Sequence, residues 1–259
     1  GFHLKYENAG AMGTDSSGNN NTLTVNSAGT NPSTTDTPSN SFLTLNPLAT
    51  GSRGTFSLGN TKVQLNLQGS VPYGQVEFGT FAVNKGKWYF EVKNLSAGGG
   101  GKMGLGISER WETNSYTNGH NNVGSVGNAI YSNQGDIKIG SGSDETASSY
   151  TDNNIIGVAF DLDNSKVYFH KEGVYQRSGD PANGTGGDTL TSSYNDYWTP
   201  WITKDSTNSA HNSTVEFNFG NPAFSISSEN SDAAGFGKFE YTVPSGYYAL
   251  CTRNLNTYG

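Results

Sequence analysis

Apolar and polar residues alternate along several short stretches of this 259-residue chain. Over residues 61–67, single polar residues separate the apolar Val63, Leu65 and Leu67. Successive side chains of a strand point to opposite faces, so this period of two predicts a half-buried β-strand. Other stretches predicted as strands are residues 41–48, 75–83, 86–95, 103–108 and 214–219.

The clearest signal is a β-hairpin over residues 154–175. The apolar run of its first half ends at Phe160, and a second apolar run begins at Val167. Between them, residues 161–165 read Asp, Leu, Asp, Asn and Ser. Asn and Asp tolerate left-handed backbone conformations and hydrogen-bond their own backbone, so this stretch favours a turn between antiparallel strands.

The composition fits short strands joined by long polar loops. Charged residues make up 14% of the chain, hydrophobic residues 32%, and 35 residues are Gly. With 14 Tyr, 13 Phe and 4 Trp, the chain is too aromatic for a disordered protein. About a dozen short strands predict an all-β fold, an antiparallel two-sheet β-sandwich, over residues 36–259. No convincing amphipathic helix is visible.

Residues 1–35 differ in composition. Residues 13–35 are a low-complexity tract of Gly, Ser, Thr and Asn, interrupted by Leu23 and Val25. Such a tract buries little apolar surface, so we predict an extended polar arm or linker over residues 1–35. Residues 15–20 look like part of a calcium loop but lack the later bidentate Glu, so we predict no metal site.

The formal net charge is −7, the isoelectric point is about 5.0, and Lys and Arg do not cluster. We therefore expect no nucleic-acid partner. No apolar run reaches the roughly 18 residues that span a bilayer, so we expect no membrane insertion.

Cys251 has apolar neighbours and is predicted to be a buried strand residue. A start at Gly1 without Met suggests a processed chain or a piece of a longer one.

No residue pattern in the sequence is typical of catalysis. Sandwich glycosidases use paired carboxylates, but Asp161 and Asp163 lie in the predicted turn, where capping is the expected role. Glu91 is predicted to be a solvated or hydrogen-bonded residue on the outer face of its strand. We therefore predict no enzyme activity and no cofactor. Trp88, Trp198 and Trp201 are assigned to the core or a sheet edge.

The order of these segments resembles the SPRY family, a concanavalin-like jelly-roll sandwich. The specific matches are GKWYFEV at residues 86–92 and GVAFDLDNSKVYFHKEG at residues 157–173. Weaker matches are residues 103–108, 130–135, 198–202 and 213–220. This resemblance implies a binding module without catalytic residues.

The N-terminal segments resemble those that precede SPRY-type domains in bacteriophage structural proteins. They read FHL at residues 2–4, GTDSSGN at 13–19, DTPSNSF at 36–42 and NPL at 46–48. The resemblance implies a protein of the virion surface, such as a tail-fibre, spike or capsid-decoration component. We expect it to contact other virion subunits and to form a homo-oligomer.

Aromatic residues in or beside polar loops are the best candidates for ligand contacts, because long loops often carry function. The candidate ligand-binding residues are Trp111, Tyr116, His120, Tyr150, Tyr194 and Tyr197. Aromatic faces stack on sugar rings and also anchor protein interfaces, so host glycan and host protein both stay open as ligands. Two alternatives are a purely structural assembly module, in which residues 1–35 pair with another chain, and a lectin-like carbohydrate-active enzyme.

Overall fold

The computed structural model describes residues 1–6, 10–26, 36–49, 54–65, 75–98, 102–109, 127–192, 196–204 and 212–259. The chain forms two compact units, Gly1–Thr35 and Asp36–Gly259.

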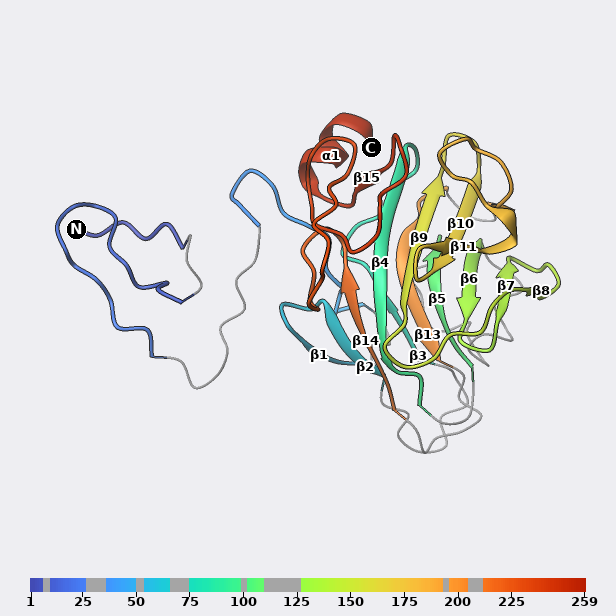
Figure 1. Cartoon of the computed structure of the whole chain (residues 1–259), viewed down its shortest axis with the longest axis horizontal. Helices are drawn as coiled ribbons and strands as arrows, with labels where there is room; N and C mark the ends of the chain where they lie inside the picture. Colours follow the sequence, from blue (N-terminus) through green and yellow to red (C-terminus); the bar gives the residue numbers. More distant parts are fainter. Residues whose placement is uncertain are drawn as a thin grey trace. The chain divides into compact units, whose positions relative to one another are not determined.

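Two β-sheets build the larger unit (Figure 1). The first has the order β1-β2-β14-β4-β9-β10-β11, with β12 beside β10 and β15 beside β4. Its pairs are antiparallel apart from β15, which runs parallel to β4. The strands are β1 (Thr55–Ser57), β2 (Lys62–Leu65), β4 (Lys87–Ser96), β9 (Ile155–Asp161), β10 (Lys166–Lys171), β11 (Val174–Tyr175), β12 (Asp188–Thr189), β14 (Ser213–Asn218) and β15 (Tyr248–Ala249).

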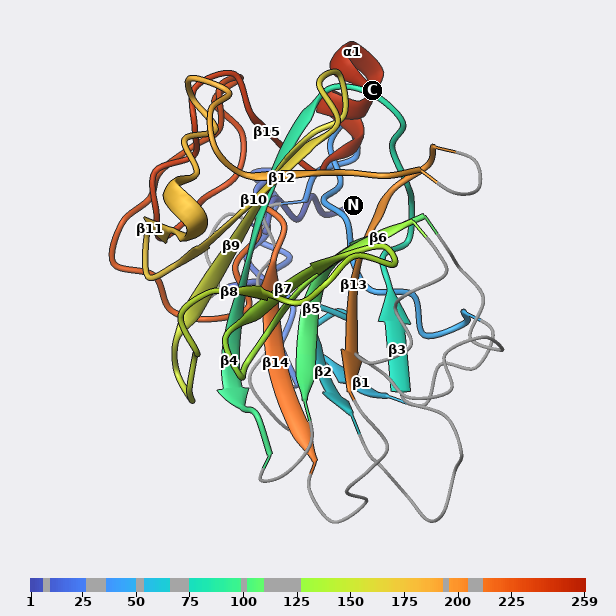
Figure 2. The same ribbon diagram turned by 90° about the vertical axis from the view of Figure 1, so that its right-hand side faces the viewer.

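The second sheet has the order β3-β13-β5-β6-β7-β8, with every neighbouring pair antiparallel. Its strands are β3 (Gln75–Phe78), β5 (Met103–Ser108), β6 (Asn128–Ser132), β7 (Asp136–Ile139), β8 (Glu145–Thr146) and β13 (Thr199–Lys204). The sheets pack against each other (Figure 2), and one apolar cluster contains residues of both. This confirms the predicted two-sheet sandwich, and the predicted hairpin is β9 and β10.

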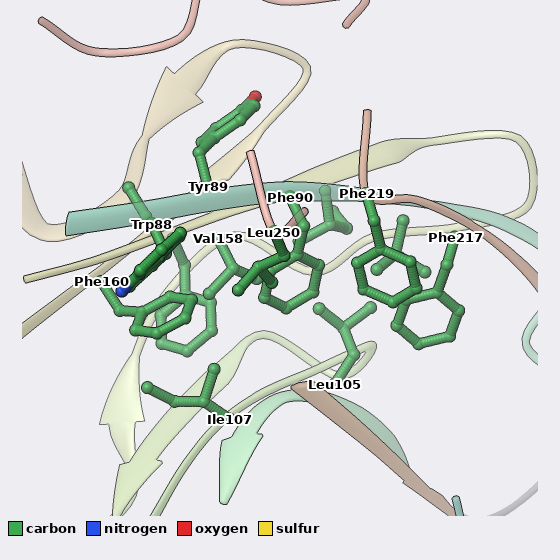
Figure 3. Packing of buried hydrophobic residues seen from close by; sticks show 14 of the residues in the cluster. Trp88, Tyr89, Phe90, Leu105, Ile107, Val158, Phe160, Phe217, Phe219 and Leu250 are labelled. Carbon is green, nitrogen blue, oxygen red and sulfur yellow. The ribbon is translucent and has the colours of Figure 1, made fainter. Parts of the chain in front are cut away.

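The core lies between the sheets and is built from alternate residues of their strands. Phe90 of β4 is fully buried, and its ring centroid lies 6.4 Å from that of Phe160 and 6.3 Å from that of Phe217. Figure 3 shows the rings of Phe90 and Phe217 beside Leu105 of the second sheet. Burial of such large apolar surfaces is the main favourable contribution to folding, so this layer holds the sheets together.

The middle of the opposite, outer face of the first sheet is buried as well, but its residues there are mostly polar or small. Tyr89 lies on the other side of β4 from Phe90 (Figure 3). Beside it on β9, the outer-face positions are occupied by Gly157 and Ala159. A Cβ added to Gly157 would lie 1.8 Å from Nε2 of His170. The small residues of β9 therefore make room for the rings on the strands beside it.

Residues 229–247, which we call the C-terminal cover, supply much of the burial of this outer face. Within the cover, Asn230 and Phe239 exchange backbone hydrogen bonds. The ring of Phe239 meets that of Tyr89 edge to face, with centroids 5.1 Å apart. Asp232 ties the cover to β15, because its carboxylate accepts a 2.8 Å hydrogen bond from the N–H of Ala249.

Two local predictions are wrong. Residues Thr252–Tyr258 form the helix α1, where no helix is predicted. Seven residues are too few to show a clear period of 3.6. Residues 41–48, predicted as a strand, make only isolated bridges at Phe42 and Leu45, because the segment pairs with two different neighbours, Cys251 and Gly79. The residues Trp88, Trp198, Trp201 and Cys251 are buried, in agreement with their predicted places.

The described part of the smaller unit folds around the carboxylate of Asp15. This carboxylate accepts hydrogen bonds from the backbone N–H groups of His3, Ser17 and Asn21, at 2.9, 2.8 and 2.8 Å. The bond from the N–H of His3 contributes most to a pKa of Asp15 well below its usual value, followed by a 2.8 Å bond from the hydroxyl of Ser17. The loop thus directs N–H donors at the carboxylate, whereas a calcium loop directs oxygen ligands at the ion.

Candidate functional sites

Glu109, the residue after β5, joins three segments at one rim of the sandwich, and we call this arrangement the Glu109 tie. Its N–H donates to the carbonyl oxygen of Gly127 at 2.8 Å. Its Oε1 accepts hydrogen bonds from Oγ of Ser192 at 2.6 Å and from the N–H of Asp196 at 3.0 Å. Glu109 is 1% exposed, and a Cβ added to Gly127 would lie 1.7 Å from its Oε2. Glu109 therefore holds the segments that contain Gly127, Ser192 and Asp196 close together.

A polar pocket of about 230 Å³, the rim pocket, shares Ser192 and Asp196 with the Glu109 tie. Leu162 and Ser165, from the turn between β9 and β10, form another part of its lining. Tyr197 follows Asp196 in the chain and is 48% exposed. This rim therefore combines hydroxyl and carboxylate groups with an aromatic ring that is half open to solvent.

A second candidate lies on the outer face, where Glu91 is fully buried. Its Oε1 accepts hydrogen bonds from the hydroxyl of Tyr89 at 3.0 Å and the N–H of Tyr241 at 2.8 Å. Its Oε2 accepts from Nδ2 of Asn218 and the N–H of Glu240, both at 3.0 Å. Burial raises the pKa of Glu91, and the four donors limit the rise because they favour the charged form. The predicted hydrogen-bonded, outer-face position is confirmed; the alternative of a solvated Glu91 is wrong.

His170 of β10 extends this network. Its Nε2 lies 2.7 Å from the hydroxyl oxygen of Tyr89, and its Nδ1 accepts a 3.1 Å hydrogen bond from the N–H of Gly173. Because Nδ1 accepts, we assign the proton of the neutral ring to Nε2, which donates to Tyr89 while Tyr89 donates to Glu91. Burial lowers the pKa of His170 to about 3, so the ring is neutral near pH 7.

Beside His170 lies a pocket of about 470 Å³, which we call the outer-face pocket. Three segments line it: the β10–β11 hairpin, residues 179–182, and residues 241–244 of the C-terminal cover. Its lining includes His170, Tyr175, Asp180, Pro181, Tyr241 and Pro244. Because Glu91 fastens Tyr241 to the sheet, the buried network sets the position of one wall.

Four of the six predicted ligand-binding residues, Trp111, Tyr116, His120 and Tyr194, lie outside the described residues. Tyr150 lies in the loop between β8 and β9, as its polar neighbours indicate, but its side chain is buried in the core: it is 2% exposed. Its ring packs edge to face on Tyr131, and its hydroxyl donates to the carbonyl oxygens of Tyr131 and Met103 at 3.2 and 3.4 Å. Tyr197 lies in the chain between two residues that line the rim pocket, Asp196 and Trp198, and its 48% exposure is what a ligand contact requires.

The two aspartates of the hairpin turn have structural partners. Asp161 accepts hydrogen bonds from the N–H and Nδ2 of Asn164 at 3.1 and 2.8 Å, and it pairs with Nζ of Lys87 at 2.9 Å. Asp163 accepts a 2.9 Å hydrogen bond from the N–H of Gly86. Asp161 therefore caps the turn, which confirms the capping interpretation for this residue, and both aspartates join the turn to the start of β4.

Within the described ranges, no group of three or more His, Cys, Asp or Glu residues is placed to hold a metal ion. In the same part of the chain, no helix has the length and apolar character needed to cross a bilayer.

Sequence reasoning missed the outer-face pocket. The four histidines are scattered along the chain, so His170 does not stand out. The available signal is alternation along β10, which places His170 and Tyr168 on the face opposite to Phe169. Asp180 and Tyr241 carry no such signal, because they belong to irregular segments that meet only in the folded chain.

No protein-family model and no curated protein matches the chain. Solved structures similar to it include the SPRY domain of human HERC1, with 16% identity and a TM-score of 0.48, covering 67% of this chain and 96% of that one. The PSpry domain of TRIM65 is similar at 16% identity and a TM-score of 0.46, over 68% and 90% of the chains. A stonustoxin structure is similar at 14% identity and a TM-score of 0.44, over 68% and 27%. These likenesses concern the fold alone.

Proposed function

We propose that this chain is a non-enzymatic binding module of the SPRY type, and that its rim pocket contacts a partner. The Glu109 tie carries the proposal, because one buried residue holds three segments together beside a polar pocket: its carboxylate bonds Ser192 and Asp196, and its N–H bonds Gly127. The half-exposed ring of Tyr197 adds an aromatic face. A ring among hydroxyl and carboxylate groups suits a sugar or a protein surface.

The setting that we propose is the surface of a bacteriophage virion. Its support is the resemblance of residues 2–4, 13–19 and 36–48 to segments of phage structural proteins. The partner would then be a host-surface glycan or protein, or a neighbouring virion subunit.

A binding assay on host cells and on a glycan array tests the rim pocket. We expect Tyr197→Ala to weaken binding about tenfold, because a central aromatic anchor contributes on the order of 1 to 2 kcal/mol. Trp111→Ala tests the loop residue favoured by the sequence. Leu48→Ala, which truncates a side chain that is 90% exposed, is the control and should bind like the parent. Equal binding by Tyr197→Ala and the parent would refute a role for this rim.

A second function, assembly through the smaller unit, is favoured by exposed apolar side chains. Phe2, Tyr6, Leu23 and Val25 are exposed by 57, 61, 43 and 47%. A unit of this size cannot bury these side chains in a core of its own, and a second chain would cover them. We propose that copies of this chain assemble in this way into a homo-oligomer.

The double variant Phe2→Ser/Tyr6→Ser tests assembly. We expect it to lower the molar mass measured by light scattering, whereas Leu48→Ala should leave it unchanged. An oligomer that persists in the double variant would assign assembly to another surface.

A further inference from the structure

Carboxylate groups surround the outer-face pocket, which has no part in the function proposed for the rim pocket. Asp180 belongs to its lining. Glu172 accepts a hydrogen bond from the hydroxyl of Tyr241, and Glu91 lies behind Tyr241, bonded to its N–H. The negative charges of Glu91 and Asp180 help to raise the pKa of Tyr175, after the larger effect of burial. The pocket therefore lies in a negative field.

The basic side chains nearest in sequence do not neutralise this field at the pocket, since each has its own partner. Arg177 pairs with Glu145 at 2.8 Å and with Asp188 at 3.0 Å. Lys238 pairs with Glu229 at 2.8 Å. Lys171 follows His170 on β10 and so belongs to the opposite face of the strand; its Nζ donates to the carbonyl oxygen of Ser149 at 2.7 Å. None of the three belongs to the lining.

Three aromatic rings meet at the pocket. The ring of His170 meets those of Tyr175 and Tyr241 edge to face, with both centroid distances 5.2 Å. The faces of such rings carry partial negative charge, which attracts cations. Pro181 and Pro244 add apolar walls. This combination suits a cation carried on an alkyl chain, because the chain contacts the walls while the charge meets the rings and the carboxylate.

The hydroxyl of Tyr175 identifies the kind of cation. It is buried and has no hydrogen-bond partner among the described residues. A buried hydroxyl without a partner is costly, so a ligand that supplies an N–H to it gains affinity. A primary ammonium group can donate such a bond, whereas a quaternary ammonium group cannot.

We propose that the outer-face pocket binds a protonated primary alkylamine, with the ammonium group between the carboxylate of Asp180 and the hydroxyl of Tyr175 and the alkyl chain against Pro181 and Pro244. Two hydrogen bonds from Asn183 lower the pKa of Asp180, so its carboxylate is charged in neutral solution. The amine is either the side chain of a lysine in a partner protein or a free small amine.

Calorimetric titration of the full chain with n-butylammonium tests the proposal, and 1-butanol serves as the neutral analogue of the same shape. We expect butylammonium to bind at least about tenfold more tightly than butanol, since only the cation interacts with Asp180 and the rings. Asp180→Asn should weaken butylammonium binding about tenfold and leave butanol unchanged. Asp144→Asn, a substitution of a surface carboxylate outside the pocket, is the matched control. Equal affinities for butylammonium and butanol would overturn the proposal.

Tyr175→Phe removes only the hydroxyl group. It should weaken butylammonium binding severalfold and leave the weaker binding of choline, a quaternary ammonium, unchanged. Thermal melting of each variant shows whether it is folded. Titration with N-acetyl-lysine methylamide distinguishes the sources: tighter binding than butylammonium favours a protein lysine, and weaker binding favours a free amine. Binding of neutral sugars in place of amines would assign the pocket to glycans and contradict the proposal.

Discussion

The two faces of β4 are both buried, but different chemistry buries them. Phe90 faces the second sheet and contacts other apolar rings, with centroid distances of 5.7 to 6.4 Å. Glu91, one residue later, faces the C-terminal cover and accepts four hydrogen bonds at 2.8 to 3.0 Å. Apolar contact is non-directional, whereas hydrogen bonds fix position and angle.

Because of this difference, one face of β4 mainly stabilises the sandwich and the other mainly positions the C-terminal cover. The apolar face supplies most of the free energy that holds the sandwich together. The polar face fixes the cover at Glu240 and Tyr241, and thereby one wall of the outer-face pocket. Substitutions on the inner face should therefore lower global stability, and substitutions on the outer face should act mainly on the cover.

The largest effect is expected for Phe90→Ala on the inner face. Truncating this fully buried ring leaves a cavity among Phe160, Phe217 and Phe219 and should lower the free energy of unfolding by about 3 to 5 kcal/mol. Urea denaturation measures it. Phe2→Ala, at a ring that is 57% exposed, should change stability by less than about 0.5 kcal/mol. Similar losses for the two variants would mean that this layer does not hold the sheets together.

Gly157→Ala should have the next largest effect, because the new Cβ would lie 1.8 Å from Nε2 of His170. Overpacking of this kind costs about 1 to 3 kcal/mol. Because the ring of His170 occupies the space that the new Cβ needs, the double variant Gly157→Ala/His170→Ala should lose less than the sum of the two single variants. Additive losses in this double-mutant cycle would show that the two residues do not compete for space.

The inner face could be predicted from the sequence, and the outer face only in part. Alternation along β4 and the β9–β10 hairpin indicates which residues face the core. It also places Glu91 on the outer face, but two of the four donors to Glu91 are backbone N–H groups, which have no sequence signature. Tyr150 shows a second limit: its polar neighbours correctly indicate a loop, between β8 and β9, but they do not reveal that its side chain is buried and its hydroxyl bonded to carbonyl oxygens.

Acid should weaken the outer face through His170. Its pKa is about 3 in the folded chain, and an unfolded histidine titrates near 6.5. Between these values the unfolded state binds more protons, so stability falls as the pH falls, by about 2 kcal/mol from about pH 7.5 to about pH 5. Burial raises the pKa of Glu91, which acts in the opposite sense: its contribution falls as the pH rises.

Comparison with His170→Gln therefore isolates the histidine. Denaturation curves of this variant should show a smaller loss of stability between about pH 7.5 and about pH 5 than the parent. His3→Gln, in the smaller unit, should retain the full loss. An unchanged pH dependence in His170→Gln would show that the buried ring does not stay neutral on folding.

The smallest global effect, and the most local one, is expected for Glu91→Gln. A glutamine keeps the shape of Glu91 but replaces one acceptor oxygen by an NH₂ group. Whichever way the amide is oriented, the N–H of Tyr241 or that of Glu240 then faces a donor, which costs about 1 to 2 kcal/mol. Hydrogen exchange at these two amides should accelerate while amides on the inner strands keep the rates of the parent.

Glu216→Gln is the matched control, since Glu216 lies on the neighbouring β14 and pairs with a partly exposed Lys62 at 3.0 Å. It should leave exchange in the C-terminal cover unchanged. If Glu91→Gln instead accelerated exchange uniformly, as Phe90→Ala should, the two faces of β4 would form one cooperative unit. The outer-face pocket would then open only when the whole sandwich unfolds. Acceleration confined to the cover would mean that this wall of the pocket can open while the apolar core stays closed.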